Sequence, residues 1–159
     1  MGSKYSAKIN DILEKYKPIL ISFNSAEMSH KPLVHKWSKK EILGHLIDSA
    51  YNNHQRFLKA EKKHNLIFEG YDQNEWVANN NYQNRDVKEI ISLFISSNQH
   101  IAHLISQLKE EDLIANTSDH NFDKICMNLV EKGKPTSLAY LIEDYIFHLQ
   151  HHLGQVTGM

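Results

Sequence analysis

Apolar residues recur at intervals of three and four along four long segments of the chain, which is the spacing of one face of an α-helix. Short segments with strand-like alternation and turn dipeptides are missing. In the first segment Pro18 is expected to kink or shorten the helix. The apolar positions of that segment are Ile9, Ile12, Leu13, Tyr16, Leu20 and Phe23.

The second helix has a clear start, because Ser38 and Glu41 have the spacing of a capping box. We expect this helix to continue to about Lys62. Its apolar face comprises Ile42, Leu43, Leu46, Ile47, Ala50 and Phe57.

The start of the third helix is likewise marked by a capping residue, Asp86, and we expect the helix to end near Lys109. Thr136 or Ser137 can cap the fourth helix. The apolar faces comprise Ile90, Leu93, Phe94, Ile101, Leu104, Ile105 and Leu108 in the third, and Leu138, Leu141, Ile142, Tyr145, Leu149, Leu153 and Val156 in the fourth.

Three long connections separate these helices: residues 24–36, 63–85 and 110–136. A short helix is expected at Gln73–Asn79 within the second connection. Four amphipathic helices of this length predict an all-α protein, a four-helix bundle with long crossover connections. Residues 1–159 are expected to form a single domain.

Composition narrows the function classes. The chain has 159 residues, 23% of them charged, with a formal net charge of −1, and no basic patch, so we expect no nucleic-acid partner. No apolar run reaches the ~18 residues of a membrane span, and residues 1–10 do not resemble a signal peptide. Cys126 is the single cysteine. We therefore expect a soluble, cytoplasmic protein without a membrane partner.

The chain carries 11 histidines, and three of them, His148, His151 and His152, fall within five residues. His148 and His152 lie on one helix face, 40° apart at 100° per residue, whereas His151 points elsewhere. An H-x-x-x-H pair can present two imidazoles to one metal ion, although in so histidine-rich a chain such a pair also arises by chance. Leu149 replaces the glutamate of H-E-x-x-H, which argues against a zinc-protease mechanism.

His45 on the second helix adds a third candidate. Its neighbours on the helical wheel are Asp48, Ser49, Asn52 and Arg56. Either a solvated face or the border of a cavity would explain this polar line. If the second and fourth helices pack side by side, His45 could meet His148 and His152. Three imidazoles would leave a divalent ion at least one open position, as in catalytic sites.

Two stretches, KWSKKEILGHLIDSAYNNHQRF (36–57) and DYIFHLQHHLGQ (144–155), resemble the DinB/YfiT-like superfamily of metal-dependent enzymes. The resemblance implies a four-helix bundle and one divalent transition metal ion per chain, commonly zinc or nickel. By this resemblance the metal ligands are His45, His148 and His152. It also implies a homodimer, and some related proteins are transferases that use low-molecular-weight thiols such as bacillithiol or mycothiol.

Several other residues are candidates for supporting roles, each with an ordinary alternative. Asp144 and Gln155 could orient an imidazole, although exposed positions would also explain them. Arg56 could bind an anionic substrate group or be an exposed helix charge. Ser49 and Asn52 complete the set of pocket candidates. We expect Trp37, Tyr71 and Trp76 to be packing residues or pocket walls, His100 and His103 to be surface or lining residues, and Cys126 not to be a nucleophile.

These observations favour a metal-dependent enzyme that acts on a small molecule, either as a hydrolase or as a low-molecular-weight-thiol S-transferase. No acidic residue is placed by sequence as an obvious general base, which weakly favours thiol transfer. A bundle that binds a metal or ligand without turnover is the alternative, and a dimeric scaffold with incidental histidines is a third.

Overall fold

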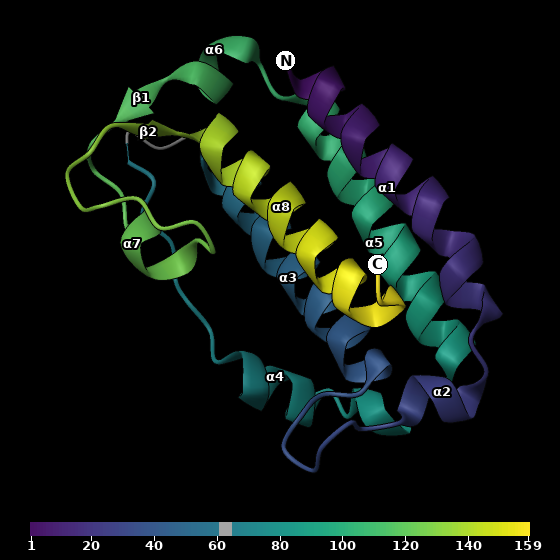
Figure 1. The fold of residues 1–159 in the computed structure, drawn as a ribbon. Coiled ribbons are helices and arrows are strands. Elements are labelled where there is room, and N and C mark those ends of the chain that lie inside the picture. Colours follow the sequence, from purple (N-terminus) through teal and green to yellow (C-terminus); the bar gives the residue numbers. More distant parts are fainter. Residues whose placement is uncertain (61–64) are drawn as a thin grey trace.

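A computed structural model describes residues 1–60 and 65–159. Its long helices lie side by side as a bundle (Figure 1), which confirms the predicted all-α fold. They are α1 (Gly2–Ser22), α3 (Lys39–Ala60), α5 (Val87–Gln107) and α8 (Leu138–Thr157).

The order of the helices around the bundle differs from their order in the chain. Helix α1 packs against α5 and α8, and α3 packs against the same two helices. Consecutive helices α1 and α3 are therefore diagonal partners, as are α5 and α8, so residues 23–38 and 108–137 cross from one side of the bundle to the other. This confirms the expected long crossovers, and it makes α3 and α8 neighbours.

Helix α1 is not shortened at Pro18, which was one of the two expected effects of this residue. It continues to Ser22. Proline removes one hydrogen bond of the helix ladder, but Leu20, beyond it, is completely buried. Burial of that side chain in the core stabilises the last turn.

The helix starts were predicted well. The Ser38 hydroxyl accepts from the Glu41 N–H at 3.2 Å, and the Glu41 carboxylate accepts from the Ser38 N–H at 2.8 Å. Asp86 accepts from the N–H groups of Lys88 and Glu89 at the start of α5. Ser137 caps α8. The ends were predicted less closely: α5 stops at Gln107 rather than near Lys109, and the expected end of the second helix near Lys62 lies outside the described residues.

The connections contain more structure than their sequences indicate. The predicted short helix is present as α4 (Gln73–Asn79), followed by the 3-10 helix η1 (Tyr82–Asn84). No element was predicted for the connections at residues 24–36 and 110–136. The first carries α2 (Ser25–Ser29), and the second carries α6 (Glu110–Ile114), β1 (Asn116–Thr117), α7 (Phe122–Ile125) and, at its end, β2 (Thr136–Ser137). Elements of two to five residues are too short to show a periodic pattern, which is why they were missed.

Two of these connections are tied to each other. The Leu66 N–H donates to the carbonyl of Asp119 at 2.9 Å, and the Asn121 side chain bonds both the N–H and the carbonyl of Phe68. Strands β1 and β2 pair antiparallel beside them. The tied segments lie beside α3 and α8 (Figure 1), where they form one side of the pocket described next.

Candidate metal centre

Three histidines from two helices converge at the interface of α3 and α8. The Nε2 atoms of His45 and His148 are 2.9 Å apart. His152 follows His148 by one helical turn, and its ring centroid is 4.8 Å from that of His45 and 4.5 Å from that of His148. One ligand nitrogen from each residue lies within 4.8 Å of the others. The structure therefore brings together the three histidines that the sequence singled out.

Burial keeps these imidazoles neutral. His45 is completely buried, and desolvation, with a smaller contribution from His152, lowers its pKa to about 4. Desolvation and the neighbouring histidines lower the pKa of His148 to about 2, and desolvation also lowers the pKa of His152. Neutral imidazole is the form that binds a metal ion, so the cluster is ready for binding at neutral pH.

The nitrogens that face each other in the cluster are suited to a metal ion. Nε2 of His45 and Nε2 of His148 are 2.9 Å apart, and an ion bound by both would leave each buried Nδ1–H, which has no partner among the described residues, to a water molecule. Tetrahedral zinc with Zn–N bonds of ~2.05 Å needs nitrogens roughly 3.3 Å apart. The distance of 2.9 Å between Nε2 of His45 and Nε2 of His148 is close to that requirement, and the three ligand nitrogens together lie within 4.8 Å of one another.

The third imidazole is held from outside the cluster. Nδ1 of His152 bonds Oε1 of Gln155 at 2.7 Å, and the amide nitrogen of Gln155 is 3.1 Å from Nε2 of His151. This leaves Nε2 of His152 free to bind a metal ion. A ligand histidine typically has its other ring nitrogen oriented in this way. On the other side, the Trp37 ring lies 5.1 Å from that of His45 and covers it.

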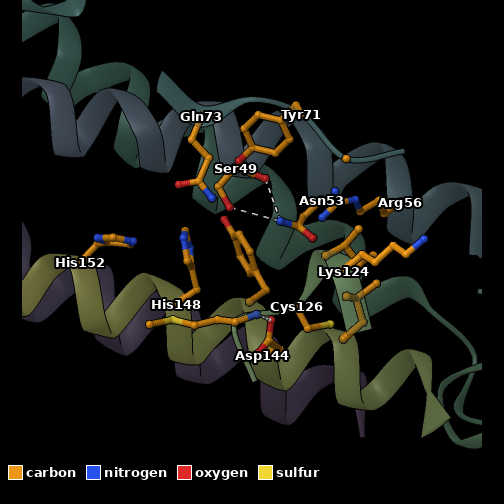
Figure 2. A pocket seen from close by; sticks show the side chains of 15 residues that line it. Ser49, Asn53, Arg56, Tyr71, Gln73, Lys124, Cys126, Asp144, His148 and His152 are labelled. Atoms are coloured by element: carbon orange, nitrogen blue, oxygen red, sulfur yellow. Dashed lines mark hydrogen bonds between the residues drawn. The ribbon is translucent and has the colours of Figure 1, made fainter. Parts of the chain in front are cut away.

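A pocket of about 350 Å³ begins at His148 and His152 and runs along the α3–α8 interface (Figure 2). Of the other candidates, Ser49, Arg56 and Asp144 line it, whereas Asn52 and Gln155 do not. The polar line on α3 thus borders a cavity and is not a solvated face: Asp48, Ser49 and Arg56 are 3%, 4% and 8% exposed. Asn52 bonds the carbonyl of Asp48 within its own helix.

Both oxygens of Asp144 and one oxygen of Asp48 accept hydrogen bonds from other residues. Asp144 accepts from the backbone N–H groups of Met127 and Asn128, and from the Asn128 side chain. These bonds hold the segment after α7 against α8 rather than an imidazole. Asp48 accepts from the Tyr82 hydroxyl at 2.7 Å and from Asn80 at 3.0 Å, and burial raises its pKa to about 6.

Several pocket residues were missed or undervalued at the level of sequence. Asn53 was missed although it follows Ser49 by one turn, and its amide bonds the Ser49 carbonyl and hydroxyl. Helical spacing from Ser49 could have found it. Gln73, Lys124 and Met127 come from connections, where no spacing rule applies. Tyr71 and Cys126 also line the pocket, and burial raises the pKa of both, to about 12 for Tyr71.

The described histidines other than the three candidate ligands, His100 and His103 among them, do not belong to the cluster. His100 packs against His54, with ring centroids 4.8 Å apart, and His103 is exposed. His120 is buried and bonds the carbonyl of Lys134. Within residues 1–60 and 65–159, no helix is long and apolar enough to cross a membrane.

Comparison with known proteins agrees with this description. The chain is 22% identical over 152 residues to a protein from Oceanobacillus iheyensis that bears the name "Putative metal-dependent hydrolase", covering 96% of this chain and 81% of that one. The fold of the present chain matches that of YfiT from Bacillus subtilis, which is described as a probable metal-dependent hydrolase with an unusual four-helix bundle topology. That match has a TM-score of 0.79 and 16% identity and covers 99% of this chain and 84% of YfiT.

The family comparison covers the second half of α1, nearly all of the other three long helices, and the histidine cluster. The model of the DinB superfamily matches residues 13–156, a range that includes all three histidines and the whole pocket. The chain therefore belongs to the DinB superfamily.

Proposed function

We propose that the protein is a metal-dependent enzyme in which His45, His148 and His152 hold one divalent transition metal ion, zinc or nickel. The observation that supports this is the convergence of three neutral imidazoles within 4.8 Å of one another, two of which, His148 and His152, line one end of a pocket. Three imidazoles suit either ion. A cluster of one buried and two half-buried histidines, two of which have an Nδ1 atom without a partner among residues 1–60 and 65–159, has no evident structural purpose.

The chain's own residues prepare this site. A divalent ion held by three imidazoles keeps a position open for substrate and lowers the pKa of a water molecule or a thiol bound there. Gln155 orients His152, and Trp37 shields His45 from solvent. The pocket alongside has room for a small molecule.

Two reactions suit such a site, hydrolysis and the S-transfer of a low-molecular-weight thiol. The name of the Oceanobacillus relative supports hydrolysis. The carboxylates support S-transfer, because Asp144 is held by Met127 and Asn128 and Asp48 does not line the pocket, so neither is placed to take a proton from water there. A thiol that loses its proton to bulk solvent needs no such base. We therefore favour S-transfer, with hydrolysis as the second candidate.

Metal content provides the first test. We expect about one transition metal ion per chain by mass spectrometry of the purified protein, and nearly none in His148→Ala. His103→Ala is the matched control, because His103 is exposed on α5 and should leave the content unchanged. Absence of metal from the wild type after incubation with zinc and with nickel would overturn the proposal.

Turnover separates an enzyme from a non-catalytic metal-binding bundle, the alternative proposal. With monochlorobimane, the thiol sulfur would form a bond to the methylene carbon, chloride would leave, and the thiol proton would pass to solvent. We expect metal-dependent consumption of at least one low-molecular-weight thiol. Hydrolysis of aryl esters without S-transfer would favour the second candidate. A metal-loaded protein inactive in both assays would favour the binding bundle.

Two further expectations belong to this proposal, a cytoplasmic location and a homodimer. Light scattering coupled to size-exclusion chromatography measures the second directly, and a mass of about 18.5 kDa would show a monomer instead.

A further inference from the structure

The end of the pocket opposite the histidines is positively charged. Arg56 from α3 and Lys124 from α7 both line it there, while His148 and His152 line the other end (Figure 2). Arg56 is only 8% exposed. A guanidinium buried to this extent normally pairs with a carboxylate, since an isolated buried charge is costly.

Arg56 has no such partner among residues 1–60 and 65–159. Its Nη2 donates to the carbonyl of Glu69 at 2.9 Å, which uses one of the five N–H donors of the guanidinium. The ionisable groups that act on it are the Tyr71 hydroxyl and the Cys126 thiol. Burial raises the pKa of both groups, so both are neutral at pH 7.

The one carboxylate that lines the pocket does not neutralise this charge. Asp144 accepts three hydrogen bonds from Met127 and Asn128, and these contacts direct it to the backbone after α7. The lining residues therefore carry two cationic side chains against one carboxylate that is already engaged.

We infer that Arg56 and Lys124 form a subsite for an oxyanion, a carboxylate or a phosphate, carried by the substrate. A guanidinium presents paired N–H donors that match either group. The inference deepens the proposed function, on which it relies for the position of the reacting group at the histidines. It does not depend on which reaction takes place there.

The spacing of the two ends limits the shape of the substrate. Arg56 follows His45 by eleven positions on α3, so their Cα atoms are roughly 16 Å apart along the helix axis. A compact anion such as inorganic phosphate could occupy the Arg56 end but could not also reach the histidines. The substrate class is therefore an elongated small molecule with its anionic group remote from the reacting atom.

Calorimetry with simple probes tests this subsite. We expect glutarate to bind the purified protein, more weakly as salt rises, and its neutral diamide, glutaramide, to bind about tenfold more weakly or not at all. In Arg56→Gln, glutarate affinity should fall about tenfold or more. Arg85→Gln is the matched control, because Arg85 is 38% exposed, pairs with Glu89 and lies outside the pocket.

The outcomes distinguish the inference from alternatives. Equal binding of glutarate and glutaramide, or unchanged glutarate binding in Arg56→Gln, would overturn it and leave Arg56 as an anchor for the Glu69 carbonyl. Binding of inorganic phosphate but not glutarate, lost in Arg56→Gln, would support it and identify phosphate as the group. If Arg56→Gln does not fold, Lys124→Gln on the α7 turn and the comparison of the two probes on the wild type remain decisive.

Metal content separates this inference from the proposed function. Arg56→Gln should retain about one metal ion per chain, because Arg56 lies three helical turns from His45. A protein without metal that still shows Arg56-dependent glutarate binding would refute the metal site and support the oxyanion subsite. A metal-loaded protein that binds neither glutarate nor phosphate would support the metal site and overturn the oxyanion subsite.

Discussion

The two helix pairs of the bundle differ in what they bury. The buried side chains of α1 are apolar or tyrosine, and Gly2 lies so close to α5 that a Cβ atom there would be 2.4 Å from the carbonyl oxygen of Ile105. On α3, by contrast, half of the buried residues are polar: Lys40, Glu41, His45, Asp48, Ser49, Asn53 and Arg56.

This difference separates stability from function. Burial of apolar surface, as on α1 and α5, is the main favourable contribution to folding. Burial of polar and charged groups, as on α3, costs free energy unless every group finds a partner, and several here do not: Nδ1 of His45, Nδ1 of His148 and Oδ2 of Asp48. The α1–α5 pair therefore stabilises the bundle, and the α3–α8 pair uses part of that stability to hold a polar pocket.

The largest expected effect tests the stabilising pair. Ile9→Ala on α1 should lower the free energy of unfolding by about 2–5 kcal/mol, because Ile9 is completely buried and its loss leaves a cavity. Ile21→Ala on the same helix should change it by less than about 0.5 kcal/mol, since Ile21 is 60% exposed. Urea denaturation measures both. Loss of bound metal in folded Ile9→Ala would contradict the separation of the two pairs.

An effect of intermediate size is expected in the pH dependence of stability, which measures how much free energy the buried histidines of α3 and α8 cost. In the metal-free protein the unfolded chain binds protons at His45 and His148 near pH 6.5, whereas the folded protein binds them only near pH 4 and pH 2. The free energy of unfolding should therefore be highest above pH 6.5 and fall toward pH 5 by on the order of 2 kcal/mol for each of the two histidines.

The variant His148→Gln isolates this contribution, because Asp48 acts in the opposite direction: its raised pKa makes the folded state gain stability as pH falls from about 6 to 3.8. Urea denaturation at pH 7 and pH 5 should show a smaller loss in His148→Gln than in the wild type. Equal losses would mean that burial does not keep His148 neutral.

The smallest expected effect sharpens the description of the polar pair. Gln155→Ala should weaken metal binding about tenfold without abolishing it, because Gln155 orients His152 through Nδ1 but is not itself a ligand. Competition with a chelator measures this change. Gln150→Ala on the same helix is the control. Unchanged affinity in Gln155→Ala would show that helix packing alone orients His152.

Some features of the molecule were predicted correctly from the sequence and others were not, for physical reasons. The start of α3 was predicted because a capping box is a local pattern between Ser38 and Glu41. The placement of His148 and His152 on one face follows from helical geometry alone. Asp144, by contrast, was considered for imidazole orientation, but its actual partners, Met127 and Asn128, come from a connection that no local pattern positions.

By itself, the sequence determined the helices, their caps and the faces on which the histidines lie, because these depend on contacts within three or four residues. Only the tertiary structure decided that α3 and α8 are neighbours, that His45 lies 2.9 Å from His148, and that Arg56 and Lys124 share a pocket with both histidines of α8. Those placements depend on how the crossovers order the helices around the core. Periodicity shows which face of a helix is buried, and packing determines which other helix that face meets.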